Sequence, residues 1–335
     1  MLLGALFLFI FLIFIGIAKR ILTVSEMLKG FIPFLGSVIT AGGVTFLGWK
    51  GLLIAYPQYK DLLNGFTYNG HAYIAAFVVL TLAICFAFYQ KFSIKKRTMN
   101  HYVAPLFLWL VINGLIAFYL KGAGFLIIPV YFGIFAFGIF IITQKSKVLL
   151  NLILGIPALL LIAPFIQMFP IGLGLKVLFG SAMLTALTFA LLLPVFGTFE
   201  NKGKWSFIFL LISCGFFAKA HYESGYEKGK AKSNSLVYIY DADTDKANWV
   251  TYDKNLDEWT KAYLGQNPKP ATSWSDTQLF SKYDSQFTYA TAAPAQEIAG
   301  PSIAFLKDSL GGNQRYFKIK ISPNRAVNRY DNCAK

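Results

Sequence analysis

Charged residues are scarce in this sequence: Asp, Glu, Lys and Arg make up 14% of its 335 residues, whereas 56% are hydrophobic. Soluble domains contain roughly a quarter charged residues, so this composition excludes an ordinary soluble protein and indicates a membrane protein. Acidic residues are rarest in positions 1–220, which contain only Glu26, Asp61 and Glu200. Residues 221–335 contain 13 acidic and 15 basic residues, a mixture typical of a soluble domain. The net charge of +15 therefore comes from basic residues between apolar segments, which argues against nucleic-acid binding.

Residues that commonly carry catalysis or metal binding are also few. The histidines are His71, His101 and His221, and the cysteines are Cys85, Cys214 and Cys333. Neither set has the spacing of a zinc site or a disulfide framework, and motifs such as H-E-x-x-H, G-x-S-x-G and G-x-x-x-x-G-K are absent. We therefore expect no catalytic residue, no metal ligand and no cofactor-binding residue in this chain.

Eight apolar runs have about the 17 to 25 residues that a helix needs to cross the hydrocarbon core of a bilayer. They are Leu2–Ala18, Phe31–Trp49, Tyr73–Tyr89, Val103–Leu120, Phe125–Ile142, Val148–Ile166, Val177–Phe199 and Trp205–Ala220. Only "KGAG" separates the fourth run from the fifth, which predicts a tight helical hairpin. The expected fold is a polytopic α-helical membrane domain over 1–220, a polar linker over 221–234 and a small β-rich domain over 235–335.

The loops between these runs differ in positive charge. One set, "AKRILTVSEMLKG", "QKFSIKKR", "TQKSK" and "ENKGK", holds 11 basic residues, and the opposite set holds five. Cytoplasmic loops carry the excess of Lys and Arg, so the first set is expected in the cytoplasm. With eight spans, both ends of the chain then lie on the non-cytoplasmic side, and His101 lies across the membrane from the other two histidines. The β-rich domain is accordingly expected outside the cytoplasm.

The start of the chain raises a separate question. Met1 opens directly into an apolar run, and "AKR" follows that run. A secretory signal peptide has the reverse arrangement, with its basic residues first. Two explanations stay open: a translocated domain precedes this helix, or a native short-tailed protein inserts with its N-terminus outside.

Polar groups at membrane depth separate a transporter from an anchor. No Asp, Glu, Lys, Arg or His lies in the middle of a predicted span, and the strongest polar groups there are Asn113 and Asn151. Such amides commonly form hydrogen bonds between helices. Small residues four apart allow close helix packing, namely Ser37 with Ala41 and Ala182 with Ala186. These features favour packing over a transport path, although a path for a neutral or lipid-like substrate stays an alternative.

The C-terminal third has β-rich patterns. "SLVYIYD" and "NWVTYD" predict one hairpin, and "SIAFL" and "RYFKIKIS" around "GGNQ" predict a second. Between them, Asn255 and Glu258 have the spacing of a capping box for a short helix that ends at Leu264, before Gly265. The chain stops at "NRYDNCAK", so we expect an incomplete β-sandwich with unpaired edge strands.

The loop "DADTD" places Asp241, Asp243 and Asp245 at alternate positions, as an EF-hand calcium loop does. An EF-hand also needs Gly at its sixth position and Glu at its twelfth, where this sequence has Lys246 and Tyr252. The flanking segments are predicted strands instead of helices. We therefore interpret the loop as a solvated turn and not as a metal site.

The segment "NSLVYIYDADTDKANWVTYDKNLDEWTKAYLG", with "LFSKYDSQFTYATAAP" and "RYFKIKISPNRAVNRYD" after it, resembles a known C-terminal region. It is similar to the part downstream of the peptidase domain in membrane-anchored zinc exopeptidases of the aminopeptidase Y type, especially the bacterial versions. The endoplasmic-reticulum metallopeptidase and the vacuolar membrane protease are eukaryotic members. The resemblance covers residues 234–330, and over 1–220 it is one of architecture. It implies a di-zinc peptidase domain outside the cytoplasm, then a multi-span membrane region and an outward β-rich domain.

The resemblance implies a protein of the bacterial inner membrane with a peptidase domain before Met1, and a fragmentary gene product here. The family's His, Asp and Glu zinc ligands match no position of this chain, so zinc is expected only in that other domain. We expect a catalytically inert anchor and accessory region, whose partners are the lipid bilayer and its own peptidase domain or a peptidase subunit. The alternatives are a small transporter or channel with a regulatory soluble tail, and a structural assembly protein.

Overall fold

The computed structural model describes residues 1–62, 65–92, 98–241, 244–271, 286–296, 298–311 and 314–327. The chain divides into two compact units, Met1–Ala231 and Lys232–Lys335. This boundary falls inside the stretch 221–234, where the composition becomes polar. Asp243, Cys333 and the terminal "NRYDNCAK", to which sequence predictions refer, lie outside the described residues, as does most of "QKFSIKKR".

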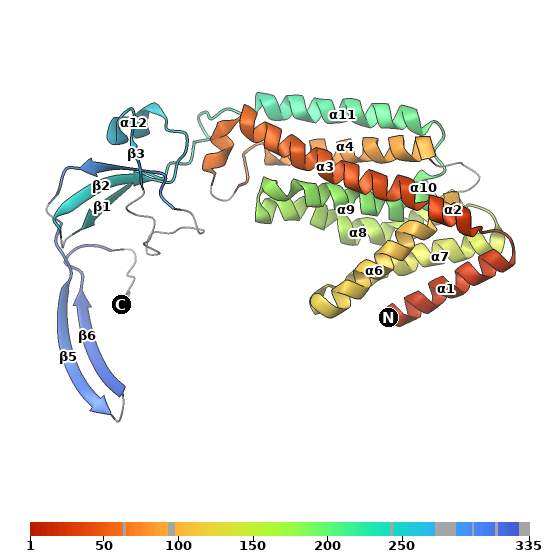
Figure 1. Ribbon diagram of the computed structural model, residues 1–335, viewed down its shortest axis with the longest axis horizontal. Helices are drawn as coiled ribbons and strands as arrows, with labels where there is room; N and C mark the ends of the chain where they lie inside the picture. Colours follow the sequence, from red (N-terminus) through yellow and green to blue (C-terminus); the bar gives the residue numbers. More distant parts are fainter. Residues whose placement is uncertain are drawn as a thin grey trace. The chain divides into compact units, whose positions relative to one another are not determined.

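The first unit is a bundle of α-helices. These are α1 (Leu2–Ala18), α2 (Val24–Lys29), α3 (Phe31–Ala55), α4 (Gly70–Phe92), α5 (Thr98–His101), α6 (Val103–Tyr119), α7 (Ile127–Thr143), α8 (Val148–Leu173), α9 (Leu178–Leu191), α10 (Leu193–Phe196) and α11 (Lys202–Tyr222). Short 3-10 helices are η1 (Pro57–Asp61), η3 (Lys121–Leu126) and η4 (Leu175–Val177). In Figure 1 the helices α3, α4, α8, α9 and α11 run alongside one another.

Six helical segments in the described part of the chain are long and apolar enough to cross a membrane. They are Val24–Ala55, Gly70–Phe92, Met99–Tyr119, Gly122–Thr143, Val148–Leu173 and Lys202–Tyr222. Two further apolar helices, Leu2–Ala18 and Leu175–Leu191, are shorter. This architecture is compatible with an integral membrane protein, because long apolar helices satisfy every backbone polar group within the segment itself.

The predicted single helix over Val177–Phe199 is wrong. In the structure α9 ends at Leu191, Leu192 leaves the helical conformation, and α10 begins at Leu193. The cause is Pro194, which has no backbone N–H to continue the ladder and whose ring crowds the carbonyl of the preceding turn. The predicted end of the sixth run at Ile166 is also wrong, because α8 continues past Pro170 to Leu173.

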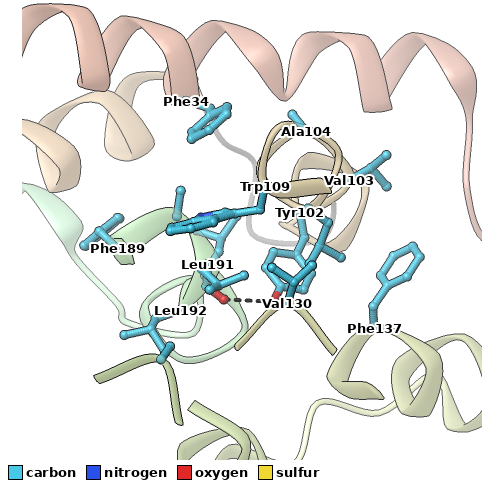
Figure 2. Close-up of a cluster of buried hydrophobic side chains, with 14 of the residues drawn as sticks. Phe34, Tyr102, Val103, Ala104, Trp109, Val130, Phe137, Phe189, Leu191 and Leu192 are labelled. Carbon is cyan, nitrogen blue, oxygen red and sulfur yellow. Dashed lines mark hydrogen bonds between the residues drawn. The ribbon is translucent and has the colours of Figure 1, made fainter. Parts of the chain in front are cut away.

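The core of the first unit lies where α3, α6, α7 and α9 meet. Figure 2 shows Phe34, Trp109, Phe137 and Phe189 among its buried side chains. Tyr102 donates its hydroxyl to the carbonyl of Leu191 at 2.8 Å, the dashed line in Figure 2. That carbonyl lies at the end of α9, where a helix leaves its last carbonyls without intrahelical partners. The tyrosine therefore satisfies a carbonyl at the end of α9, where Pro194 interrupts the helix.

Small residues are buried on both α3 and α9. Ser37 and Ala41 on α3 are fully buried, as are Ala182 and Ala186 on α9, and the two helices pack against each other. The burial of these four residues is compatible with the predicted close packing of helices. Without a hydrophobic driving force between helices in lipid, such close contact is a main source of stability.

Gly30 allows the junction of α2 and α3 to approach α5. A Cβ atom at this position would lie 2.6 Å from the Cα atom of His101 and 2.9 Å from its carbonyl oxygen. These are backbone atoms, which cannot rotate away. A second contact joins the same segments, because the Thr23 amide donates to Asn100 Oδ1 at 2.9 Å.

Gly30→Ala is expected to lower the free energy of unfolding by about 1–3 kcal/mol, since the new methyl group forces the two backbones apart. The matched control is Gly43→Ala on α3, where a Cβ atom would meet nothing within 4 Å. That control is expected to be neutral or to stabilise by up to about 1 kcal/mol, because alanine favours a helix. Thermal unfolding in detergent measures both, and equal effects would contradict the close approach.

The second unit contains two antiparallel sheets. β1 (Val237–Asp241), β2 (Lys246–Thr251), β3 (Lys269–Pro270) and β4 (Tyr289–Ala293) form one, in the order β1-β2-β4-β3, and β5 (Ser302–Gly311) and β6 (Gln314–Ser322) form the other. Both predicted hairpins are confirmed, with Val237 opposite Val250 and Ile303 opposite Ile321. Their packing as an incomplete sandwich stays a prediction.

The short helix α12 (Glu258–Leu264) is present, but its predicted cap is wrong. Asp257 is the N-cap instead of Asn255, and its Oδ1 atom accepts hydrogen bonds from the amide and the hydroxyl of Thr260 at 2.8 and 2.7 Å. Burial tends to raise the pKa of Asp257, but these two bonds and the nearby Lys232 ammonium outweigh it and lower the pKa. A carboxylate two residues closer to the helix thus outcompetes the amide.

Asp257→Ala is expected to destabilise α12 by about 1 kcal/mol at neutral pH, because the N-cap bonds are lost. Asp257→Asn is the matched control, since asparagine caps equally well but carries no charge. Because the folded-state pKa is depressed, the carboxylate's contribution is present above about pH 4 and disappears as pH falls through that lowered value. Hydrogen exchange of the α12 amides in the full chain measures this. An Asp257→Ala chain with unchanged protection at both pH extremes would contradict the cap.

Candidate functional site

Polar and aromatic side chains gather where α3 ends, α4 begins and α11 ends. After α3 the chain passes through η1 before α4 starts at Gly70. The last turn of α11 forms hydrogen bonds to Tyr56, which follows α3, and to Asn69, which precedes α4. This cluster, the polar cap, consists of Tyr56, Tyr59, Thr67, Asn69, Tyr73 and His221. Asp61, one of the three acidic residues of positions 1–220, is buried in η1.

Asn69 is the centre of the polar cap, because its backbone and its side chain serve different helices. Its backbone carbonyl accepts a hydrogen bond from the Ala72 amide at 3.0 Å and so starts α4. Its Nδ2 atom donates to the carbonyl of Ala220 at 2.7 Å and to the hydroxyl of Tyr59 at 2.8 Å. Its Oδ1 atom accepts from the hydroxyl of Thr67 at 2.6 Å. Every polar atom of this side chain therefore has a partner.

The bond to Ala220 satisfies a carbonyl that the geometry of α11 leaves open. The last four carbonyls of a helix have no intrahelical amide to bond with. Beyond α11, the Glu223 amide bonds to the carbonyl of Lys219 and the Ser224 amide to that of His221. The Ala220 carbonyl between them is held by Asn69 in a fully buried position. Leaving such a buried group unsatisfied costs about 1–3 kcal/mol.

Aromatic rings surround this hydrogen-bond network. The rings of Trp49 and Tyr59 stack with centroids 6.4 Å apart, and Tyr73 meets Trp49 edge-on at 5.9 Å. Tyr56 stacks on Tyr59 at 5.2 Å, and its hydroxyl lies 2.5 Å from Nδ1 of His221. Tyrosine and tryptophan combine an apolar body with a polar tip, which suits the boundary between lipid and water. The arrangement therefore fits the end of a membrane-spanning bundle.

The contact between α4 and α11 continues from the polar cap along both helices. Ser213 donates its hydroxyl to the carbonyl of Ala76 at 2.8 Å, and Ser206 donates to that of Ala83 at 2.8 Å. Apart from this contact α11 is exposed, since only 11% of its apolar segment is buried in the protein. The last helix is thus held to the bundle mainly through α4.

A small cavity adjoins the polar cap. Its lining residues are Tyr59, Leu62, Thr67, Tyr68, Asn69, Glu223, Ser224, Gly225 and Tyr226. The volume is about 10 Å³, which is room for one water molecule at most. Since the side chains of Thr67 and Asn69 are already engaged, the polar cap can hold three helix ends together but leaves little space for a substrate.

Glu26 and His101, which the sequence places in inner loops, come together at the other end of the bundle. The Nε2 atom of His101 lies 3.9 Å from a carboxylate oxygen of Glu26, and Lys29 donates to the other oxygen at 2.9 Å. His71 lies in the first turn of α4 and His221 in the last turn of α11. The length of α4 therefore separates His101 from the other two histidines.

The two asparagines within predicted spans, Asn113 and Asn151, both donate hydrogen bonds to backbone carbonyls. Asn113 donates to the carbonyl of Trp109 in its own helix at 2.9 Å. Asn151 donates from α8 to the carbonyl of Pro194 at 3.1 Å and to the hydroxyl of Ser146 at 3.1 Å. The expected hydrogen bond between helices is thus confirmed for Asn151 and wrong for Asn113.

The aspartate loop forms the turn between β1 and β2. Asp241 accepts a hydrogen bond from the Thr244 hydroxyl at 2.8 Å, and Asp245 accepts one from Tyr240 at 2.8 Å. The bond to Asp245 raises the pKa of Tyr240. Asp245 has a φ of +52°, which Asp tolerates better than most residues. The two described aspartates therefore stabilise the turn. Within the described ranges, no three His, Cys, Asp or Glu side chains are placed to hold a metal ion.

Asn69 and the two serines of α11 were not among the residues predicted from the sequence. One signal was available, since asparagine is a preferred residue at the start of a helix. The partners could not be read from the sequence, because Asn69 and Ala220 are 151 positions apart and Ser213 and Ala76 are 137 apart.

Comparisons with known proteins find no relative: no family model, no curated protein and no solved structure matches this chain.

Asn69→Ala is expected to lower the free energy of unfolding of the first unit by about 1–3 kcal/mol, because it leaves the buried Ala220 carbonyl without this hydrogen bond. Protection of the amides after Ala220 from hydrogen exchange should fall with it. The matched control is the neighbouring Tyr68→Phe, which removes one exposed hydrogen bond of 3.2 Å to the Ala231 carbonyl. That change is expected to cost less than about 0.5 kcal/mol. Equal losses in the two variants would show that Asn69 is not the centre of the cap.

Proposed function

We propose that this chain is the non-catalytic membrane anchor and accessory region of a membrane-bound zinc exopeptidase. The observation that carries the anchoring role is the hydrogen bond from Asn69 to Ala220. It ties the end of α11, the last helix before the second unit, to the start of α4. An anchor needs its last helix to be held firmly in the bundle, because a loosely held helix would not fix the position at which the attached domain begins.

The peptidase part of the proposal is supported by the resemblance of residues 234–330 to the region downstream of the peptidase domain in that family. In our proposal the peptidase domain holds the zinc, and this chain contributes no zinc ligand. The proposal assigns no chemical step to this chain. The role of this chain would be to hold the peptidase at the membrane surface and to limit access to it.

We propose eight spans, with both termini on the non-cytoplasmic side of a bacterial inner membrane. The six long helices and the shorter Leu2–Ala18 and Leu175–Leu191 supply the eight. The support for orientation is the excess of basic residues in the loops at the end of the bundle that holds Lys29 and Lys202. The polar cap and the second unit would then lie outside the cytoplasm.

The hydrogen bonds of the polar side chains within the bundle favour an anchor over a transporter. Asn113 and Asn151 are both occupied with backbone carbonyls. One feature favours the rival: the break between α9 and α10 lies beside a cavity, and broken helices form the substrate sites of many transporters. That cavity, whose lining includes Tyr102, Gly133 and Asn151, measures about 10 Å³ and has room for one water molecule at most.

The proposal is tested by measuring aminopeptidase activity in two preparations. The chain expressed and purified by itself is expected to hydrolyse no aminoacyl-anilide substrate. Chain recovered from its native membranes through a tag on the second unit is expected to bring with it an aminopeptidase activity that a zinc chelator removes. An unrelated polytopic protein with the same tag is the control for carry-over.

Two results would overturn the proposal. The first is chelator-sensitive hydrolysis by the chain purified alone. The second is solute flux in proteoliposomes that Asn151→Leu abolishes, with no peptidase activity recovered from native membranes. The latter would establish the small transporter or channel instead.

A further inference from the structure

The hairpin of β5 and β6 has two chemically different faces. In an antiparallel ladder, residues directly opposite each other place their side chains on the same face. Ile303 lies opposite Ile321 and Phe305 opposite Ile319, so these four share a face. The same register, after a bulge between Phe305 and Lys307, adds the pairs Asp308 with Phe317 and Leu310 with Arg315. This apolar face consists of Ile303, Phe305, Leu310, Phe317, Ile319 and Ile321.

The opposite face of the hairpin is polar and basic. It holds Lys307 opposite Lys318, Lys320 opposite Ala304, Tyr316 opposite Ser309, and Ser302 opposite Ser322. The charged pair on the apolar face is neutral, because Arg315 donates to Asp308 at 2.6 and 3.0 Å. The Arg315 guanidinium also covers the Phe317 ring at 4.9 Å. The hairpin is therefore an amphipathic ribbon with its net charge on one face.

The apolar face is exposed. Phe305 is 68% exposed, Leu310 is 80% and Phe317 is 51%, and the three isoleucines range from 41% to 60%. The core of the four-stranded sheet is formed by other residues, Ile239, Val250, Ala271 and Phe287. Soluble surfaces rarely expose so many adjoining large apolar side chains, and a two-stranded hairpin is marginal by itself. The face therefore needs a cover.

The charge of the second unit indicates what the cover is. Residues 232–301 contain six basic and nine acidic residues, a net charge of −3. The hairpin, residues 302–322, contains four basic residues and one acidic residue, a net charge of +3. Residues 323–335, which follow the hairpin, contain three basic residues and one acidic residue, a net charge of +2. The hairpin thus combines a net positive charge with a large exposed apolar face. Basic residues combined with exposed aromatic and aliphatic side chains are typical of elements that lie on anionic membranes.

We propose that the apolar face of the β5–β6 hairpin lies in the anionic surface of the bilayer that the first unit spans. The six apolar side chains enter the boundary between headgroups and acyl chains. The lysines of the other face stay within about 10 Å of the headgroups, where salt does not fully screen their attraction. Since the same polypeptide holds the hairpin and the membrane helices, the surface is always at high effective concentration. This goes beyond the anchoring role and does not depend on the peptidase partner.

The test uses the full chain in lipid nanodiscs, with its three cysteines replaced by alanine. An environment-sensitive fluorophore is attached at Leu310→Cys on the apolar face or at its neighbour Ser309→Cys on the basic face. With phosphatidylglycerol present, the label at 310 is expected to emit at shorter wavelength and to be quenched by spin-labelled acyl chains. The label at 309 should resemble one in water. Lys318→Gln with Lys320→Gln, or high salt, should weaken the quenching at 310, as should nanodiscs of phosphatidylcholine alone.

Two outcomes overturn the proposal. If the label at 310 emits as in water in every nanodisc, the face is not covered. If its emission shifts but spin-labelled lipid does not quench it, the cover is a protein surface, either a second copy of this chain or the proposed peptidase domain. Because the side chains of Lys318 and Lys320 are exposed, the lysine variants are not expected to disturb folding.

Discussion

A single buried asparagine organises the end of the bundle from which the second unit departs. Asn69 starts α4 with its backbone and closes α11 with its side chain, through a bond of 2.7 Å to the Ala220 carbonyl. Both ends of a helix carry unsatisfied backbone groups, and inside a membrane protein there is little water to satisfy them. Because Asn69 bonds to the start of α4 and to the end of α11, it holds these two helix ends at the same level of the bundle.

The same constraint explains several other polar contacts in the first unit. Tyr102 closes the end of α9, and Asn151 holds the carbonyl of Pro194 in the break that follows. Ser206 and Ser213 bind α11 to α4 through carbonyl groups. In each case a side chain supplies a donor to a backbone acceptor on another helix, which is a main way to join helices in lipid. A bundle whose polar groups are used in this way is suited to holding a domain at a membrane.

The sequence was sufficient for those features that depend on local pattern. Apolar length predicted the six helices that are long enough to cross a membrane, and β-rich runs predicted both hairpins. It was insufficient where a distant or competing group decides. The cap of α12 moved from Asn255 to Asp257 because the carboxylate reaches the Thr260 amide directly. The partner of Asn69 lies 151 positions away, and no local pattern indicates it. Pro194 was visible, but its effect depended on whether neighbouring side chains could accommodate a break.

The side of the membrane on which the polar cap lies is the central claim, because an anchor for an outer domain must end outside the cytoplasm. The direct measurement labels single cysteines in intact cells with a maleimide that cannot cross the membrane. Tyr222 at the end of α11 is 91% exposed, and Lys145 between α7 and α8 is exposed at the opposite end of the bundle. With the three native cysteines replaced, Tyr222→Cys should be labelled in intact cells and Lys145→Cys only after permeabilisation. The reverse pattern would contradict the account.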